Sequence, residues 1–265
     1  MDGVIYRGTE TLPFARECVK LLREHGARTG FLTNNSTRAR SDYVEILSRH
    51  GIVALENEIM TSGEATARHL LAQGLAHDRI YVIGGDGLVR TLSRAGFTVD
   101  IADGGDPCRF VVVGWDKTFN FRKIVRAQTE IITNKAHLIA TNTDAMFPAA
   151  GGKLLPGAGA MVAAVETASG TKAELIGKPN AISLRYLLQG LGIPEDNPPD
   201  DVWMVGDRID TDIACGKAIG AHTVLITSGI SDRDQAEKTP ENLRPDFVID
   251  SLLHLPDLLP LTGGI

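Results

Sequence analysis

Short apolar runs, many of them β-branched, alternate along this chain with longer amphipathic segments almost from end to end. Several of the runs are apolar throughout, which is typical of parallel strands covered on both faces. The alternation predicts an α/β fold built on a parallel sheet with crossover helices. We expect strands at Arg28–Leu32, Ile80–Ile83, Phe110–Val113, His137–Ala140, Val202–Val205, Thr223–Ile226 and Phe247–Ile249, and helices that include Leu12–Glu24, Arg40–Arg49, Arg122–Thr133 and Ala158–Ala168.

The first residues do not fit this alternation. The segment from Met1 to Tyr6 has the residues of a turn that follows a strand, and no strand comes before it. A parallel sheet does not begin with a turn. We therefore expect a strand ahead of Met1 in the natural protein, so that the chain starts from a misplaced start codon or is a truncated product or fragment.

Composition narrows the class of protein. With 265 residues, 43% of them hydrophobic, the chain can bury a sizeable core in one large domain or two ordinary ones. A net charge of −6 and the lack of Lys/Arg runs argue against nucleic-acid and membrane partners, so phosphate chemistry would need a metal or a few local cations. The separated cysteines Cys18, Cys108 and Cys215 indicate buried thiols in a reducing compartment. Without a signal peptide or an apolar span, we expect a soluble cytoplasmic protein.

Polar residues that directly follow apolar strands are candidates for chemistry, because α/β sheets form their sites at the carboxyl ends of strands. Thr33, Asn34 and Asn35 follow the first expected strand and could hold phosphate oxygens. They are equally typical of a helix N-cap, and taken alone they favour the cap. Lys178, in a turn after a short apolar run, could provide a point charge for phosphate, although an isolated lysine in a turn is usually just solvated.

Carboxylates gather after the expected strand Val202–Val205. Asp207, Asp210 and Asp212 lie within one turn of each other, and Asp2 follows the start of the chain. Closely spaced carboxylates suit Mg²⁺, which takes a few of them and keeps water ligands. For Asp210 a helix cap is the simpler interpretation. For Asp207 the helix-cap interpretation has less support, because a carboxylate placed directly after a buried strand needs a partner.

Four ordered motifs resemble those of haloacid dehalogenase (HAD) superfamily phosphatases, and more narrowly the NagD-like, p-nitrophenylphosphatase branch with a large α/β cap (class IIA). They are Asp-Gly-Val-Ile-Tyr-Arg-Gly at 2–8, Leu-Thr-Asn-Asn-Ser at 32–36, Ile-Gly-Lys-Pro at 176–179 and Val-Gly-Asp-Arg-Ile-Asp-Thr-Asp-Ile at 205–213. The resemblance covers essentially the whole chain. Four motifs in the family's order are far more specific than one.

The resemblance implies a Mg²⁺-dependent hydrolase of small phosphate monoesters that acts through an aspartyl phosphate. The family's first motif is Asp-x-Asp, in which the first aspartate is the nucleophile and the second is the acid and base. Asp2 matches the second, so the nucleophile would be the residue before Met1, and the chain as printed would be inactive. The main-chain carbonyl of Asp2 and the carboxylate of Asp207 would bind the metal with Asp212 behind them, Thr33 and the backbone at Asn34 and Asn35 would hold the phosphoryl group, and Lys178 would neutralise its charge.

The resemblance also implies a division into domains. A Rossmann-like HAD core would comprise residues 1–75 and 173–265, and an inserted α/β cap would comprise residues 76–172. The cap would select the leaving group of a small phosphorylated metabolite, with Asn142, Asp144, Met146 and Phe147 on its substrate-facing loop. Met146 and Phe147 could equally pack under the cap. The sequence leaves the oligomeric state open, and a homodimer is offered by family analogy alone.

Two other functions compete with this one. Gly84-Gly85-Asp86-Gly87 follows an expected strand and begins a partial GxGxxG, but the third glycine position is Arg90 and the segment lies in mid-chain, so a tight turn explains it better than a dinucleotide site. The second alternative is a non-catalytic, HAD-like protein that binds a phosphate ligand. The presence of Asp2, Lys178 and Asp207 favours the enzyme.

Overall fold

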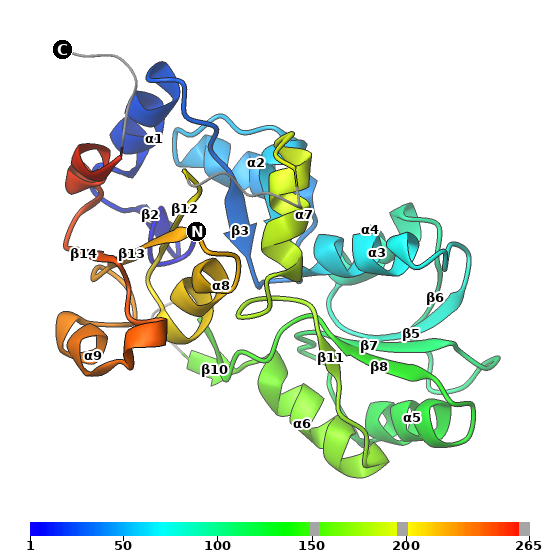
Figure 1. The fold of residues 1–265 in the computed structure, drawn as a ribbon. Coiled ribbons are helices and arrows are strands. Elements are labelled where there is room, and N and C mark those ends of the chain that lie inside the picture. Colours follow the sequence, from blue (N-terminus) through cyan, green and yellow to red (C-terminus); the bar gives the residue numbers. More distant parts are fainter. Residues whose placement is uncertain (149–153, 195–200, 260–265) are drawn as a thin grey trace. The chain divides into compact units, whose positions relative to one another are not determined.

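A computed structural model describes residues 1–148, 154–194 and 201–259. The chain folds into two compact units (Figure 1). Unit 1 comprises Met1–Leu32, Ser41–Met60 and Lys178–Ile265, and unit 2 comprises Thr33–Arg40 and Thr61–Gly177. The α/β class with parallel sheets is confirmed. The core and cap boundaries expected near residues 76 and 172 stay predictions.

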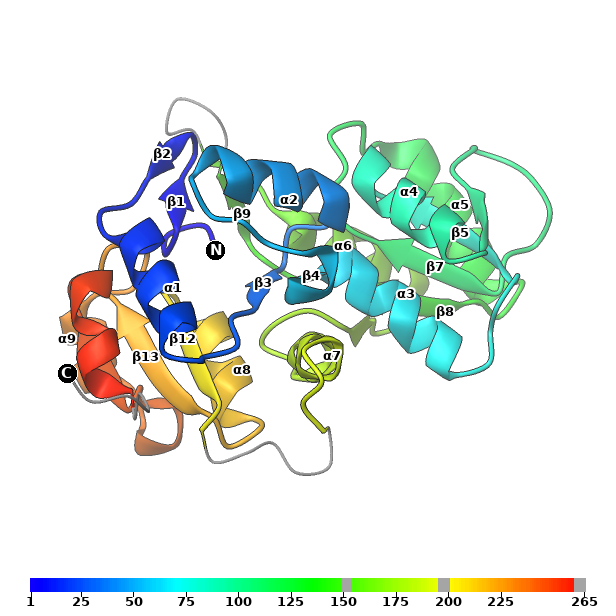
Figure 2. The same ribbon diagram turned by 90° about the horizontal axis from the view of Figure 1, so that it is seen from above.

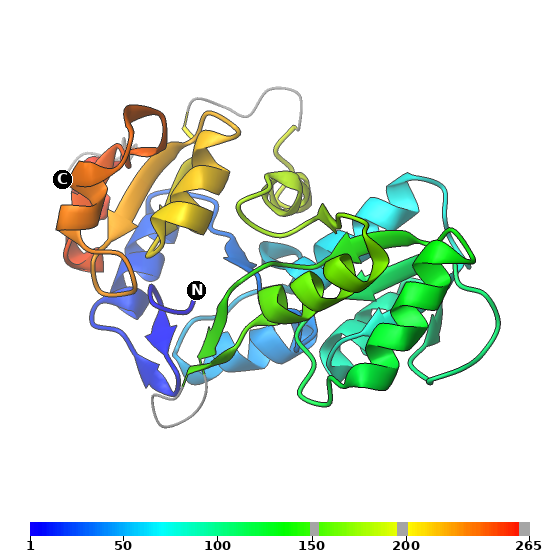
Figure 3. The same cartoon turned by 90° about the horizontal axis from the view of Figure 1, so that it is seen from below.

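Unit 1 contains a parallel sheet in the order β12 (Trp203–Gly206), β13 (His222–Ile226), β14 (Phe247–Ile249). Side chains alternate along β13. Val224 and Ile226 pack into a cluster with α1 (Ala15–Glu24), whereas Leu225 packs on the other face with Ile213 and Ala236. The views from above and below show α1 over one face of this sheet and α8 (Ala214–Lys217) over the other (Figures 2 and 3).

A second, two-stranded sheet joins β3 (Phe31–Thr33) to β4 (Ile59–Thr61). In the described part of the chain β3 pairs with β4 alone and β12 with β13 alone. The strand expected from Arg28 begins only at Phe31, because residues 28–30 have no neighbouring strand with which to form a ladder. The remaining elements of this unit are β1 (Tyr6–Arg7), β2 (Glu10–Thr11), α2 (Arg40–Arg49), η1 (Glu56–Glu58), α7 (Ile182–Gly190), the π-helical turn η3 (Ile209–Ile213), α9 (Arg233–Lys238), η4 (Glu241–Leu243), η5 (Leu252–His254) and η6 (Pro256–Leu258).

Unit 2 contains a five-stranded parallel sheet in the order β11 (Glu174–Leu175), β8 (His137–Ala140), β7 (Phe110–Val113), β5 (Arg79–Ile83), β6 (Thr98–Asp100). Val111 pairs with Tyr81 on one side and Leu138 on the other. These three side chains pack in one cluster with α5 (Phe121–Ile132) and α6 (Ala158–Ser169). The helices α3 (Ser62–Ala72) and α4 (Asp86–Arg94) cover the other face of this sheet (Figure 1).

Local chemistry explains where two helices begin. The helix expected from Leu12 begins at Ala15, because Pro13 precedes it and Phe14 has a left-handed φ of 63°. The helix expected from Arg122 begins at Phe121, because the Asn120 side chain accepts hydrogen bonds from the Arg122 and Lys123 amides and caps it. Among the described residues, none of the helices is long and apolar enough to cross a membrane.

Candidate active site

The residues singled out in the sequence fall into two groups, one in each unit. The unit 1 group consists of Asp2, Lys178, Asp207 and Asp212. The unit 2 group consists of Thr33, Asn34, Asn35, Asn142, Asp144, Met146 and Phe147.

Asp212 organises the unit 1 group. Its Oδ1 accepts a hydrogen bond from Lys178 Nζ at 2.6 Å, and its Oδ2 accepts from the Asp207 and Arg208 amides, each at 3.1 Å. Both side chains of the ion pair are buried. Burial alone would raise the pKa of Asp212, but the Lys178 ammonium, the Met1 amine and the hydrogen bonds lower it overall. Both oxygens of the Asp212 carboxylate therefore accept hydrogen bonds from the protein.

Asp207 is buried and has fewer partners. It follows β12 directly, and its Oδ2 accepts a hydrogen bond from the Ile230 amide at 3.1 Å. Among the described residues, Oδ1 has no hydrogen-bond partner. Burial first, and then the negative charge of Asp212, raises the pKa of Asp207 to about 6.

Glycines allow backbone to approach Asp207 closely. A Cβ at Gly3 or at Gly229 would collide with the Asp207 carboxylate, and Gly3 also has a left-handed φ of 75°. The contact at Gly3 brings the turn after Met1 to this carboxylate. The turn itself is confirmed, since the Val4 and Ile5 amides donate to the Met1 carbonyl at 3.2 and 2.8 Å.

At the start of this turn, Asp2 and Met1 differ in exposure. The Asp2 side chain is exposed. The Met1 amine is buried, and that burial, together with the Lys178 ammonium, lowers its pKa. The unit 1 group thus combines one buried ion pair, one buried carboxylate with a raised pKa and one exposed carboxylate.

The donors of this group fit a magnesium ion better than a transition metal. No cluster of three or more His, Cys, Asp or Glu side chains that could hold a metal exists in the described part of the chain. Mg²⁺ does not need one, because it is commonly held by one or two carboxylates and keeps several waters. Asp207 supplies a buried carboxylate oxygen that has no partner in the ranges that the structure describes, and Asp212 fixes the backbone of Asp207 by accepting a hydrogen bond from its amide.

The loop after β3 holds the first part of the unit 2 group. Thr33 Oγ1 accepts from the Asn35 amide at 3.2 Å, and Asn35 Oδ1 accepts from the amide and hydroxyl of Thr37 at 2.9 and 2.7 Å. The helix-cap interpretation of these residues is wrong, because α2 begins only at Arg40. They form a side-chain-stabilised turn at the carboxyl end of a strand.

Asn142 and Asp144 contact this loop within unit 2. Asn142 Nδ2 donates to the Asn34 carbonyl at 2.9 Å, Asn34 Nδ2 donates to Asp144 Oδ1 at 3.2 Å, and the Asp144 amide donates to Asn142 Oδ1 at 3.2 Å. Two segments more than 100 residues apart therefore share one hydrogen-bond network. Gly157 and Gly159, at the start of α6, belong to the same region, since their amides donate to the carbonyls of residues 145 and 144.

Met146 and Phe147 lie on β9 (Met146–Pro148), which forms an antiparallel hairpin with β10 (Leu154–Pro156). The Met146 side chain is 49% exposed. Phe147 stacks on Trp115, with ring centroids 4.3 Å apart. Met146 is thus exposed to solvent, whereas part of the Phe147 ring is covered by packing within unit 2, and the substrate-facing role of both residues stays a prediction.

The glycine-rich turn after β5 serves packing. A Cβ at Gly87 would collide with the backbone of Thr37 and Arg38, and the Gly87 amide donates to the Thr37 carbonyl at 3.2 Å. The amide that a dinucleotide pyrophosphate would need is therefore already bonded to the protein. This arrangement rules against the dinucleotide interpretation.

Sequence reasoning missed one part of the unit 1 group and misassigned another. The segment after β13 provides the Ile230 amide and the close approach of Gly229 to Asp207, and Ser228 Oγ donates to the Gly3 carbonyl at 3.0 Å. The signal was present, because Thr-Ser-Gly follows an apolar strand there. Asp210 is not the expected helix cap; its carboxylate pairs with the Arg208 guanidinium at 2.6 Å.

Comparisons with known proteins identify the family of the chain. Residues 1–98 match the model of the haloacid dehalogenase-like hydrolase family, and residues 175–255 match a HAD-hydrolase-like model. Chronophin from Rattus norvegicus is 34% identical over 100% of this chain and 86% of its own length. The p-nitrophenyl phosphatase structure from Archaeoglobus fulgidus superimposes with a TM-score of 0.86 at 34% identity, over 97% of this chain and 96% of that one.

A third relative, the glycerol phosphate phosphatase Rv1692 from Mycobacterium tuberculosis solved with magnesium, superimposes with a TM-score of 0.85 at 28% identity, over 96% of this chain and 74% of that one. The two relatives of known structure are named as phosphatases, and all three relatives cover nearly the whole chain, both units included. The chain therefore belongs to the haloacid dehalogenase-like hydrolases, in the branch of NagD and the p-nitrophenylphosphatases.

Proposed function

We propose that this protein is a magnesium-dependent phosphatase that hydrolyses small phosphate monoesters through an aspartyl-phosphate intermediate. The observation that carries the proposal is the buried Lys178–Asp212 ion pair beside Asp207, whose carboxylate keeps one oxygen without a partner among the described residues. Membership of a phosphatase branch supports it. A magnesium ion in the structure of the mycobacterial relative supports the choice of metal.

The proposed metal ligands are the Asp207 carboxylate and the main-chain carbonyl of Asp2. Asp212 holds the Asp207 and Arg208 amides and Lys178 in place, so it acts on the metal only through other groups. When bound, the ion would stabilise the negative charge that builds on the transferring phosphoryl oxygens.

The residues of the chain divide the remaining work. In a chain that has an aspartate joined directly to Met1, that aspartate would attack phosphorus, the bond from phosphorus to the ester oxygen would break, and Asp2 would give its proton to the departing alcohol. Asp2 then takes a proton from water, whose oxygen attacks the aspartyl phosphate and releases inorganic phosphate. By the family pattern, Thr33, Asn34 and Asn35 would be donors to phosphoryl oxygens, and the Lys178 ammonium would neutralise phosphoryl charge. These roles follow the family pattern.

The leaving group would be recognised by the second half of the unit 2 group. Asn142 and Asp144 offer an amide and a carboxylate, and Met146 offers an exposed thioether on β9. The mixture of polar and apolar groups suits a small phosphorylated metabolite with hydroxyls.

The test measures hydrolysis of p-nitrophenyl phosphate by the chain preceded by an apolar segment that ends in aspartate and is joined directly to Met1. We expect turnover with Mg²⁺, none in excess chelator, and a loss of at least about 10²-fold in Asp207→Asn. Asp250→Asn is the matched control, because Asp250 also follows a strand of this sheet but pairs with Arg233 on the surface. Undiminished turnover in chelator would refute the metal role. Mg²⁺-dependent binding of inorganic phosphate without turnover would favour the non-catalytic alternative.

A further inference from the structure

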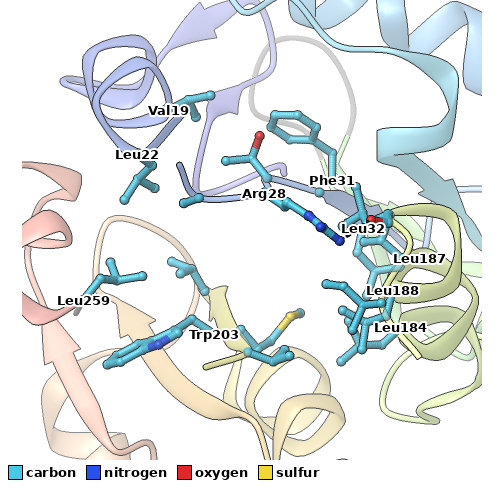
Figure 4. Close-up of a pocket in the computed structure, with 18 of the residues that line it drawn as sticks. Val19, Leu22, Arg28, Phe31, Leu32, Leu184, Leu187, Leu188, Trp203 and Leu259 are labelled. Atoms are coloured by element: carbon cyan, nitrogen blue, oxygen red, sulfur yellow. Dashed lines mark hydrogen bonds between the residues drawn. The ribbon is translucent and has the colours of Figure 1, made fainter. Parts of the chain in front are cut away.

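The residues after Leu32 leave the apolar part of β3. Phe31 and Leu32 are buried and line the cavity of unit 1 that Figure 4 shows. Residues 33–37 follow them in unit 2, and we call this segment the phosphoryl loop. Its residues are polar, so hydrogen bonds rather than apolar packing must hold its backbone in place.

Two buried side chains converge on one main-chain oxygen of the phosphoryl loop. Ser62 Oγ donates to the Asn34 carbonyl at 2.5 Å, and Asn142 Nδ2 donates to the same oxygen at 2.9 Å. Both donor side chains are buried. A carbonyl oxygen has two lone pairs, so it can accept both hydrogen bonds at once. The position of this oxygen is therefore set by two side chains that lie 28 and 108 residues away along the chain.

The Ser62 hydroxyl does not serve the start of its own helix. Ser62 is the first residue of α3, and hydroxyls at helix starts commonly accept hydrogen bonds from the first amides of the helix. Thr61 Oγ1 does this here, because it accepts from the Glu64 amide at 3.0 Å. The Ser62 hydroxyl donates to the phosphoryl loop instead, which indicates a role in that loop.

The peptide bond between residues 34 and 35 transmits the constraint. Among the described residues the cis peptide bond is at Lys178–Pro179, so the bond after Asn34 is trans, and its carbonyl and N–H point in opposite directions. Fixing the carbonyl therefore directs the Asn35 amide away from the two donors, and this amide donates to Thr33 Oγ1 at 3.2 Å. Donors on the carbonyl also polarise the peptide and strengthen the hydrogen bond that its N–H donates.

The Thr33 hydroxyl is the last group in this chain of hydrogen bonds. Its oxygen accepts from the Asn35 amide, and within the ranges that the structure describes no group accepts its proton. A hydroxyl whose oxygen accepts one hydrogen bond becomes a better donor in the next. Thr33 is thus prepared to donate to a phosphoryl oxygen.

We propose that Ser62 is a positioning residue for the phosphoryl group. Together with Asn142 it fixes the Asn34 carbonyl, and through the Asn35 amide it orients the Thr33 hydroxyl toward a phosphoryl oxygen. Ser62 itself does not touch the substrate. The inference rests on the proposed function, because the phosphoryl loop has this task only in a protein that binds a phosphoryl group there.

The test measures the binding of inorganic phosphate to the printed chain by titration calorimetry with Mg²⁺, which needs no turnover. Ser62→Ala should weaken phosphate binding by about fivefold, the effect of one net hydrogen bond, and Asn142→Ala should weaken it at least as much. Inorganic phosphate has no leaving group, so the loss in Asn142→Ala does not come from leaving-group contacts. The NMR resonance of the Asn35 amide should move in both variants. Ser62→Cys, with a weakly donating thiol, replaces Ser62→Ala if that variant does not fold.

Thr66→Val is the matched control. Thr66 is also buried in α3, and its hydroxyl donates at 2.8 Å, but to the Ser62 carbonyl within the helix rather than to the phosphoryl loop. We expect Thr66→Val to lower the thermal midpoint while the phosphate affinity and the Asn35 resonance stay as in the wild type.

The proposal is overturned if folded Ser62→Ala binds phosphate as tightly as the wild type. It is also overturned if Thr66→Val weakens binding equally, because the loss of any buried hydroxyl in α3 would then explain the effect. Absence of phosphate binding by the wild-type chain would overturn it as well, whereas the hydrolysis assay with chelator decides the proposed function separately.

Discussion

Replacing Lys178 by methionine leaves the Asp212 carboxylate buried without its ammonium partner. The ion pair is 2.6 Å long, with side-chain exposures of 9% and 7%, so water cannot replace the lost charge. Removing one partner of a buried pair costs about 3–5 kcal/mol in the free energy of unfolding. For a chain of this length that corresponds to a fall of roughly 6–15 °C in the thermal midpoint.

A double-mutant cycle separates the pair from its surroundings. Asp212→Asn alone leaves Lys178 buried without a counter-charge, whereas Lys178→Met with Asp212→Asn removes both charges together. We expect the double variant to be less destabilised than the sum of the single variants by about 1–3 kcal/mol, measured by urea unfolding in chelator at pH 7. The slope of unfolding free energy against urea must stay constant across the cycle.

The control is an ion pair of similar length on the surface. Lys172 Nζ lies 2.8 Å from Glu166 Oε2, but the Lys172 side chain is 88% exposed. The same cycle with Lys172→Met and Glu166→Gln should give a coupling of about 0.5 kcal/mol or less. Additive effects within about 0.5 kcal/mol at Lys178 and Asp212 would refute the reasoning that the buried pair holds this part of unit 1 together.

Three further predictions follow from other contacts. Joining an apolar segment that ends in aspartate to Met1 should raise the thermal midpoint; changing that aspartate to asparagine should keep the rise but lower turnover by on the order of 10⁶. Burial alone would raise the pKa of Asp246, but hydrogen bonds from Lys217 and Thr223 lower it overall, so its contribution to stability is present above the unfolded value of about 3.9 and is lost as pH falls below it. Because the Asp246 side chain is 36% exposed and screened by solvent, Asp246→Asn should cost about 0.5–1 kcal/mol at pH 7 and almost nothing near pH 2, measured by urea unfolding against wild type. Burial raises the pKa of Cys18 to about 11 and of Cys215 to about 12, so an aromatic disulfide reagent at pH 8 should react with these thiols only after denaturation; fast reaction in the native state would contradict their burial.

The thiol prediction agrees with the sequence, which indicated unpaired, buried cysteines. All three are free and buried in the structure. The strand bounds at Phe110–Val113, His137–Ala140 and Phe247–Ile249 were likewise predicted correctly, because uninterrupted apolar runs between polar residues mark strands without help from tertiary contacts.

Proximity within the site was predictable only in part. The rule that sites form at the carboxyl ends of strands predicted Asp207, Asp212 and Lys178 as site residues. The structure brings these three residues together. Gly229 and Ile230, after β13, contact Asp207 through backbone, and no side-chain chemistry in the sequence singles them out. The network between Asn34 and Asp144 could not be predicted from spacing, since a hydrogen bond across 110 residues depends on how the intervening chain folds.

The sequence by itself determined the α/β class, the family and the residue types of the candidate site. The spacing of apolar residues, the polar residues that follow each apolar run and the order of the motifs can all be read along the chain. Only the tertiary structure decided how those residues are used. Asp212 accepts hydrogen bonds from a lysine and two amides, whereas one oxygen of Asp207 has no partner in the described part of the chain. This difference between two similar carboxylates depends on burial and on the partners that the fold brings to each.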